Sequence, residues 1–250
     1  MPIHRLPMAW VANFTHINRV RAIDEYVTSA VAAGIPQIVI LGAGFDSRAY
    51  RIAGAERSRF FEVDHPNTSA VKKAHIARAL GSLPEHVKYV AVDFQRDRVP
   101  ESLDAAGFKP LQRSLFVWEG VSNYLTEDAV RSTLSFIGSL APGTGLAFTY
   151  VDEAVLHNPT HFAGGSEVQK TFARLGEPWT FGIRPSRAFD FFKECGLDLV
   201  YDLSAADYRK QYYKTAARIR GYEFYHVVLA HVPKRAAHFR AHLSQEVLFA

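Results

Sequence analysis

A glycine-rich turn directly after an apolar run is the feature of this sequence best suited to binding a ligand. Residues 37–41 read Gln-Ile-Val-Ile-Leu, and Gly42-Ala43-Gly44 follow at once. Glycines at a turn between a strand and a helix let backbone N–H groups approach a ligand closely. A Gly-x-Gly pair alone is a weak signal, so its weight depends on what the neighbouring strands carry.

Acidic residues follow the next three expected strands at the points where those strands end. Asp64 follows Gly42 by 22 residues, where a carboxylate can accept hydrogen bonds from both hydroxyls of a ribose. Asp93, with Phe94 beside it, could accept from an adenine amino group, and Glu119 ends the fourth strand. Because the carboxyl ends of parallel strands share one edge of the sheet, we expect these four strand ends to face one ligand.

The residues after the second glycine decide which nucleoside ligand fits. A dinucleotide fingerprint needs a third glycine, and position 47 is Ser. Asp46 places an acid where a pyrophosphate would lie, which disfavours NAD or FAD. S-adenosyl-L-methionine has a ribose and no phosphate. The turn therefore favours this cofactor, with S-adenosyl-L-homocysteine as its product, over an NAD-type oxidoreductase.

The elements that must position these residues alternate along the chain. Short apolar runs alternate with helical stretches, which is typical of an α/β fold with a largely parallel sheet. Strands are expected over residues 37–41, 59–63, 87–92, 114–118, 145–151, 197–201 and 223–232, and helices over 19–33, 67–80, 127–140, 185–195 and 205–220. The late strand–helix–strand run predicts an antiparallel strand at one edge of the sheet.

Several segments resemble the leucine carboxyl methyltransferase family, most closely its bacterial branch of polyketide and small-molecule O-methyltransferases. They are residues 37–51, 61–66, 92–94, 119–125 and 176–182. The resemblance runs from about Arg19 to Tyr213. It implies a Rossmann-like class I methyltransferase fold, with a mostly parallel seven-stranded sheet, helices on both faces and S-adenosyl-L-methionine as methyl donor.

The same resemblance implies roles for the residues at the strand ends. Asp64 would bind the ribose, Asp93 and Phe94 would surround the adenine, and Gly42 and Glu119 would line the donor site.

An arginine on the helix before the first strand is also implied, as the partner of the donor's methionine carboxylate. Arg21, three residues before Asp24, fits that place best, and Arg19 is the second choice. The planar guanidinium of arginine matches the geometry of a carboxylate. The alternative for either residue is an ordinary surface arginine.

Candidates for the acceptor side come from the end of the fifth strand and from the segments after the fourth and fifth strands. Residues 152–182 are expected to form a lid or acceptor-pocket insertion. A carboxylate acceptor needs no base at neutral pH, whereas for a phenol or alcohol His157 or His161 could act as the base. Tyr124 and Tyr150 could position the acceptor or pack in the core. We therefore predict an O-methyltransferase acting on a carboxyl or hydroxyl group.

Composition limits the class of protein. A chain of 250 residues with 48% hydrophobic and 22% charged residues suits a single domain over residues 1–250. The single cysteine, Cys195, excludes an internal disulfide framework and fits a cytoplasmic location. No run of 18 apolar residues is present, so we expect no membrane partner. His157 and His161 lack the glutamate of a His-Glu-x-x-His pattern, so we expect no metal.

The charge is concentrated near the end of the chain. The net charge is +4, and residues 207–240 hold eight Lys or Arg against two Asp or Glu. A basic end can meet nucleic acid, but a solvated helix face explains it better. We therefore expect a small-molecule acceptor rather than nucleic acid, and a homodimer if a second chain covers the pocket. The alternative function is a catalytically silent S-adenosyl-L-methionine-binding protein, associated with RNA through this end.

Overall fold

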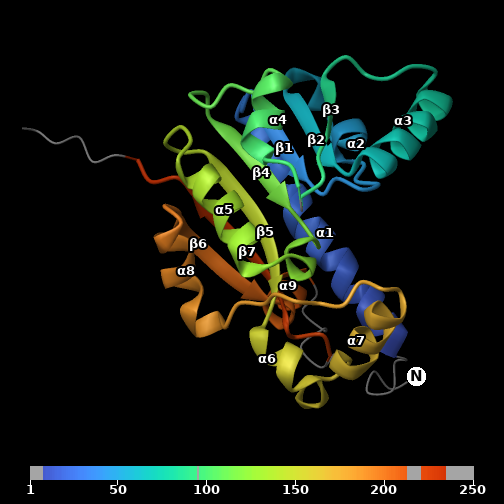
Figure 1. Ribbon diagram of the computed structural model, residues 1–250, viewed down its shortest axis with the longest axis vertical. Helices are drawn as coiled ribbons and strands as arrows, with labels where there is room; N and C mark the ends of the chain where they lie inside the picture. The colour runs from blue at the N-terminus through green and yellow to red at the C-terminus, as the bar shows by residue number, and fades with distance from the viewer. Residues whose placement is uncertain (1–7, 95, 213–220, 235–250) are drawn as a thin grey trace, which may run out of the picture.

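The computed structural model describes residues 8–94, 96–212 and 221–234. Its strands are β1 (Gln37–Leu41), β2 (Arg59–Asp64), β3 (Val87–Ala91), β4 (Ser114–Trp118), β5 (Gly145–Val151), β6 (Asp198–Ser204) and β7 (Tyr225–His231). They form one seven-stranded sheet in the order β3-β2-β1-β4-β5-β7-β6 (Figure 1).

The first five strands are parallel, and β7 runs antiparallel to both of its neighbours, β5 and β6. The carboxyl ends of β1 to β4 therefore meet at one edge of the sheet, which we call the rim. The prediction that the antiparallel strand lies at the edge is wrong, because β7 inserts between β5 and β6. The order of these last strands depends on pairing between distant segments, which the local pattern does not reveal.

Helices cover both faces of the sheet (Figure 1). The α-helices are α1 (Met8–Ala32), α2 (Arg48–Arg51), α3 (Pro66–Leu80), α4 (Val99–Ala105), α5 (Glu127–Gly138), α6 (Glu153–His157), α7 (Gly165–Arg174), α8 (Ala188–Glu194) and α9 (Ala205–Tyr212). The 3₁₀ helices are η2 (Ala55–Arg57), η3 (Ser122–Tyr124), η4 (Pro159–His161) and η5 (Pro185–Arg187). Helices α4, α5 and α8 pack into the core on one face, and α1, α2 and α9 pack on the other.

Burial explains why the central strands are so apolar. Every residue of β1 and of β4 is buried, as expected for parallel strands covered on both faces. The edge strand β6 has exposed and half-buried residues instead.

The first helix begins at Met8, well before the predicted start at residue 19. Val11, Thr15, Asn18 and Ala22 are buried and follow one another at helical spacing. Polar Thr15 and Asn18 interrupt the apolar pattern on this face, so the pattern did not predict the first turns.

Residues 152–182 contain α6, η4 and α7, and Figure 1 draws these helices beyond the rim, near the start of α1. The assignment of this segment as a lid stays a prediction.

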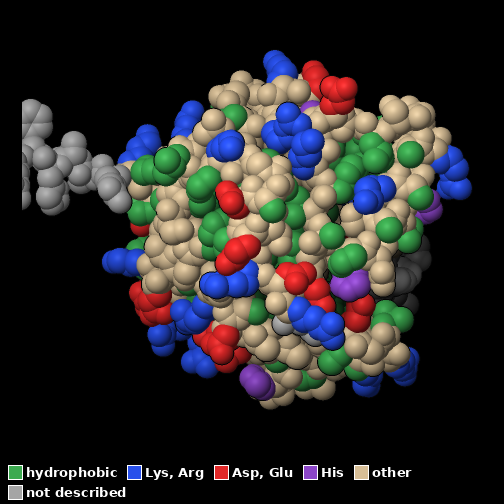
Figure 2. Space-filling model, turned by 45° about the horizontal axis from the view of Figure 1, so that its top comes forward, with side chains coloured by type: hydrophobic (Ala, Val, Ile, Leu, Met, Phe, Trp, Pro, Cys, Tyr) green, Lys and Arg blue, Asp and Glu red, His purple; other side chains and the backbone are tan. Residues whose placement is uncertain are grey.

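The basic end of the chain is only partly described. Residues 213–220 and 235–250, which carry much of its charge, lie outside the described residues. Arg209 belongs to this basic run, yet its side chain is buried rather than solvated. On the face that Figure 2 draws, acidic side chains lie among the basic ones.

Across the described ranges, no helix has the length and apolar character needed to cross a membrane.

Candidate functional site

The glycine turn after β1 needs glycine at both positions. Gly42 has φ +64° and Gly44 has φ +44°, a backbone region that other residues rarely adopt. A Cβ atom on Gly42 would lie 2.3 Å from Cγ2 of Val121, which follows β4. The two strand ends therefore approach each other closely, and a side chain at position 42 would force them apart.

Asp64 at the end of β2 fastens this turn. One of its carboxylate oxygens accepts a hydrogen bond from the backbone N–H of Gly44, and the other accepts from the N–H of His65 at 2.7 Å. The side chain is half-buried at the rim. A carboxylate has about four acceptor positions, so Asp64 keeps capacity for a ligand beside the turn.

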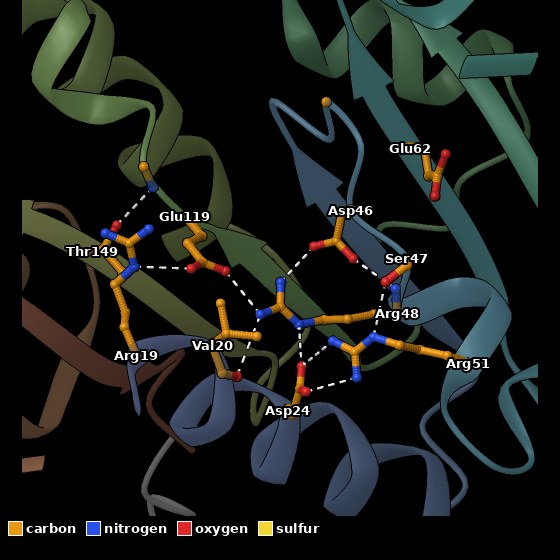
Figure 3. Close-up of polar contacts among 12 residues, drawn as sticks. Arg19, Val20, Asp24, Asp46, Ser47, Arg48, Arg51, Glu62, Glu119 and Thr149 are labelled. Atoms are coloured by element: carbon orange, nitrogen blue, oxygen red, sulfur yellow. Dashed lines mark hydrogen bonds and ion pairs between the residues drawn. The ribbon is translucent and has the colours of Figure 1, made fainter. Parts of the chain in front are cut away.

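A chain of alternating charges lies next to the turn (Figure 3). The guanidinium of Arg48, at the start of α2, is 3% exposed and forms ion pairs with Asp24, Asp46 and Glu119. Arg51 makes two hydrogen bonds to Asp24, of 2.7 and 2.8 Å. The buried Arg48 is thus matched by carboxylates, as burial of charge requires.

Glu119, at the end of β4, joins this network to α1. Its Oε1 accepts from Nε of Arg19 at 2.9 Å, and its Oε2 lies 2.8 Å from Nη2 of Arg48. Burial raises the pKa of a carboxyl group, but the two arginines outweigh that effect and hold the pKa of Glu119 below 4.5. Glu119 is therefore ionised at neutral pH.

His16, one turn before Arg19 on α1, extends the network further. A guanidinium only donates hydrogen bonds, so Nδ1 of His16 accepts from Nη2 of Arg19 at 2.9 Å. Partial burial and the charge of Arg19 lower the pKa of His16 below 6.5, against the opposing effect of Glu119. The neutral ring consequently carries its proton on Nε2.

Two pockets meet at these residues. The rim pocket, of about 520 Å³, is lined among others by Gly42, Gly44, Phe45, Asp46 and Arg48. The helix pocket, of about 470 Å³, is lined among others by Asn123, Tyr124, Val168, Phe172, Tyr222 and Tyr225. His16, Arg19 and Gly120 line both pockets and form what we call the boundary.

The predicted residues of the first four strand ends lie at the rim, but not all in these pockets. Gly42, Gly44 and Glu119 line the rim pocket. Asp64 borders it through its hydrogen bond to Gly44. Asp93 and Phe94 follow β3 and line neither of the two pockets. Oδ2 of Asp93 lies 3.7 Å from Nε of Arg96, and the Phe94 ring packs against the core.

Arg21, the first choice for the carboxylate-binding arginine, does not reach the rim. Its side chain is 55% exposed, with Nε 3.6 Å from Oε1 of Glu25 and the guanidinium over the ring of Tyr212. Two residues along an α-helix correspond to a rotation of about 200°. Arg21 therefore points away from the face on which Arg19 reaches both pockets.

Of the four acceptor-side candidates, Tyr124 alone lines one of these two pockets. Tyr150 is 1% exposed, donates its hydroxyl to Asp202 and stacks on His226 with ring centroids 4.7 Å apart, so it belongs to the core. His157 and His161 are exposed and line neither pocket. They end α6 and η4, where their side chains meet solvent.

Sequence reasoning missed His16 and Arg48. His16 precedes Arg19 by three residues, a spacing that places two side chains on one helix face, so a longer predicted helix would have connected them. The burial of Arg48 had no such signal, since two of its three carboxylate partners, Asp24 and Glu119, are distant in sequence. Among the described residues, no cluster of three or more His, Cys, Asp or Glu is arranged to hold a metal ion.

Comparison with known proteins identifies the relatives of this chain. The sequence profile of the leucine carboxyl methyltransferase family matches residues 7–138. A protein of Mycolicibacterium gilvum is 40% identical over 131 residues, which are 52% of this chain and 42% of the relative. A protein of Mycobacterium bovis is 35% identical over 184 residues, 71% of this chain and 55% of the relative. Both are provisionally named S-adenosyl-L-methionine-dependent methyltransferases.

A solved structure shares the fold. The crystal structure of a provisionally named methyltransferase from Thermobifida fusca matches with a TM-score of 0.65 at 18% identity, over 88% of this chain and 82% of that one. The expected Rossmann-like fold of class I methyltransferases is thereby confirmed. The matched region spans about half the length of the two curated relatives.

Proposed function

This chain belongs to the leucine carboxyl methyltransferase family, and from that premise we propose that it is an S-adenosyl-L-methionine-dependent O-methyltransferase acting on a carboxyl or hydroxyl group of a small molecule. The observation that carries the proposal is the pair of pockets at the rim, which meet at His16, Arg19 and Gly120. A group-transfer enzyme needs two ligands in contact at one point, and this boundary provides that point.

The rim pocket suits the donor. Glycine at positions 42 and 44 leaves the backbone uncovered beside the ligand, and Asp64 stands at the adjoining strand end to accept from ribose hydroxyls. The pocket also offers both signs of charge through Arg19 and Glu119. The methionine end of the donor is a zwitterion, so it can use both, with Arg19 facing its carboxylate.

The helix pocket suits the acceptor. It is lined by Tyr124, Phe172 and Tyr225, whose rings give a largely apolar wall. Its polar groups include Asn123 and the boundary residues. Thr15, Glu167 and Thr171 also line it, and an apolar wall with a few polar groups is the usual form of a small-molecule site.

When bound, S-adenosyl-L-methionine supplies a methyl group made electrophilic by the sulfonium. The task of this chain is to hold an acceptor oxygen in line with that methyl at the boundary. Such alignment is worth about 7–11 kcal/mol of the barrier in favourable cases. The paired charges of Arg19, Arg48 and Glu119 keep the boundary fixed before the ligands arrive.

His16 favours a carboxylate over a hydroxyl as the acceptor. A hydroxyl has to lose its proton to a base, but Nδ1 of His16 already accepts from Arg19 and its Nε2 carries a proton. The same Nε2–H can donate a hydrogen bond to an anionic oxygen. A carboxylate is ionised at neutral pH and needs this donor rather than a base.

Transfer from tritium-labelled donor tests the proposal. The full chain is incubated with matched pairs of acids and phenols, such as benzoic acid with phenol and 2-naphthoic acid with 2-naphthol. We expect label in methyl esters of the acids, with less or none in ethers of the phenols. Label on a ring carbon instead of an oxygen, or no transfer although donor and acid both bind, would contradict the proposal.

A further inference from the structure

The turn before β7 holds a tyrosine in a conformation that tyrosine rarely adopts. Tyr222 has φ +59° and is, within the described ranges, the sole non-glycine residue with a positive φ. Bulky residues in this region are strained, and the strain persists only where the surroundings fix it. Strained residues of this kind concentrate at functional sites, so the role of Tyr222 needs an explanation.

A buried arginine fixes the turn. The side chain of Arg209, on α9, is 1% exposed, and its Nη1 donates to the carbonyl of Gly221 at 2.6 Å. Its Nη2 donates to Oε1 of Glu223 at 2.9 Å, and the same carboxylate accepts from the N–H of Gly221 at 2.7 Å. Arg209 also donates to Oγ1 of Thr15 at 3.1 Å. The residues on both sides of Tyr222 are thereby tied to α9 and α1.

The fixed turn places the Tyr222 ring in the wall of the helix pocket. The backbone N–H of Tyr222 donates to the carbonyl of Ala163 at 2.8 Å, which joins the turn to the segment before α7. The ring covers Gly164, where a Cβ atom would lie 2.7 Å from ring carbons. Gly164 thus leaves the space that the ring occupies.

Tyr222 is the last of three planar groups that lie one after another from the boundary: the Arg19 guanidinium, the Tyr225 ring and the Tyr222 ring. The guanidinium of Arg19 lies 5.5 Å from the centroid of the Tyr225 ring. The Tyr225 ring lies nearly parallel to that of Tyr222, with an angle of 16° and centroids 6.5 Å apart. Tyr222 lines the helix pocket and not the rim pocket. Its ring can therefore limit the acceptor without touching the donor.

We infer that Tyr222 is a specificity-determining residue, whose ring sets how large a flat acceptor the helix pocket admits, and that Arg209 and Glu223 are positioning residues that hold it. The inference rests on the proposed function, because it takes the helix pocket as the acceptor site. Burial and the nearby Glu167 raise the pKa of Tyr222, so its hydroxyl stays protonated and the ring adds no charge to the wall.

Binding of three planar acids of increasing length tests this inference without requiring turnover. Benzoate, 2-naphthoate and anthracene-2-carboxylate are titrated by calorimetry into the full chain saturated with S-adenosyl-L-homocysteine. Tyr222→Asn removes the ring with a residue that tolerates a positive φ, so loss of the ring is separated from strain. Tyr222→Phe keeps the ring and serves as the matched control.

We expect Tyr222→Asn to shift the ratio of the Kd values for the anthracene acid and benzoate about tenfold towards the larger acid, the scale of a change in pocket fit. Tyr222→Phe should leave that ratio unchanged, and both variants should bind S-adenosyl-L-homocysteine like the wild-type chain. An unchanged ratio in a folded Tyr222→Asn variant would overturn the inference. So would a parallel loss of all three acids and of S-adenosyl-L-homocysteine.

The positioning role has its own measurement. Glu223→Gln retains the shape of the side chain but weakens its bonds to Arg209 and Gly221. We expect it to shift the same ratio in the same direction by a smaller factor, and to add nothing in the Tyr222→Asn background. A Glu223→Gln variant with lowered stability and an unchanged ratio would show that these contacts support the fold and do not position the ring.

The outcomes separate this inference from the proposed function. A wild-type chain that binds the acids but transfers no methyl contradicts the proposed function, while the Kd ratios still decide the role of Tyr222. If S-adenosyl-L-homocysteine does not bind, the proposed function fails and the acids are titrated into the free chain. A wild-type chain that binds none of the three acids overturns the inference.

Discussion

Nε of Arg19 lies 2.9 Å from Oε1 of Glu119, at the place where the rim pocket and the helix pocket meet. The pair joins α1 to the end of β4, one hundred residues away in the sequence. Arg48 approaches the second oxygen of Glu119 at 2.8 Å. The carboxylate therefore cannot turn away from either arginine without breaking an ion pair, and Arg19 is held where both ligands would reach it.

The first prediction compares two arginines on α1. Arg19→Ala should weaken binding of S-adenosyl-L-methionine more than binding of adenosine, because adenosine lacks the methionine carboxylate. The expected difference is about 1.5–3 kcal/mol, the scale of a hydrogen bond to a charged group. Arg21→Ala, which changes an exposed side chain two residues away, is the matched control and should change neither affinity. Calorimetry that finds equal losses for both ligands in Arg19→Ala would assign the carboxylate to another residue.

Sequence alone predicted the centre of the sheet well and its last strands less well. β1, β4 and β5 begin and end at the predicted residues, because continuous apolar runs bounded by glycine or polar residues determine them locally. The place of β7 between β5 and β6 depends on long-range pairing. Local periodicity carries no information on such pairing.

The residues of the candidate site also include some that the sequence predicted and some that it did not. Gly42 and Glu119 were predictable because strand ends of a parallel sheet share one edge. The choice between Arg19 and Arg21 depends on which face of α1 meets the sheet. That face contains the polar but buried Thr15, so the hydrophobic pattern does not identify it. No sequence pattern singled out Tyr222; its positive φ in the structure did.

The second prediction concerns the close approach at the glycine turn. Gly42→Ala should destabilise the fold more than Gly34→Ala. Gly34 has a similar φ of +69°, but a Cβ atom there would meet nothing within 4 Å beyond its chain neighbours, whereas one on Gly42 would lie 2.3 Å from Val121. The strain common to both is about 1–2 kcal/mol, and the clash should add about 1–3 kcal/mol. Urea unfolding measures both. Equal losses of unfolding free energy in the two variants would contradict the close approach of Gly42 to Val121. Adding Val121→Ala to Gly42→Ala should restore part of the lost stability.

The third prediction follows the charge of Glu119. Its pKa is held below 4.5 by Arg19 and Arg48, so the folded state binds fewer protons than the unfolded state in that range. The stability contributed by Glu119 is therefore complete above pH 4.5 and lost as the pH falls through its folded pKa. Glu119→Gln should lose about 3–5 kcal/mol at neutral pH, as expected when one partner of a buried ion network is removed.

Urea unfolding between neutral and acid pH tests this sign. The wild-type chain should lose more stability on acidification than Glu119→Gln, so the two curves converge. Parallel curves for the two proteins would show that Glu119 is not the ionised centre of the network.

The fourth prediction is that methyl transfer needs no metal. The boundary supplies donors and ion pairs from Arg19 and His16, and alignment of the two ligands requires no Lewis acid. Turnover should survive a strong chelator such as EDTA, and the product should carry a methyl ester or ether. Loss of turnover with EDTA that magnesium or zinc restores would contradict this mechanism.

Calorimetric titration of S-adenosyl-L-homocysteine measures whether the rim pocket binds the methyl donor. We predict one site per chain, weakened by about 1.5–3 kcal/mol in Asp64→Ala and by less in Asp64→Asn, which keeps one acceptor oxygen. Asp198→Ala, at the exposed start of β6, is the control and should bind like the wild-type chain. No binding by the wild-type chain, or unchanged affinity in a folded Asp64→Ala variant, would contradict the account.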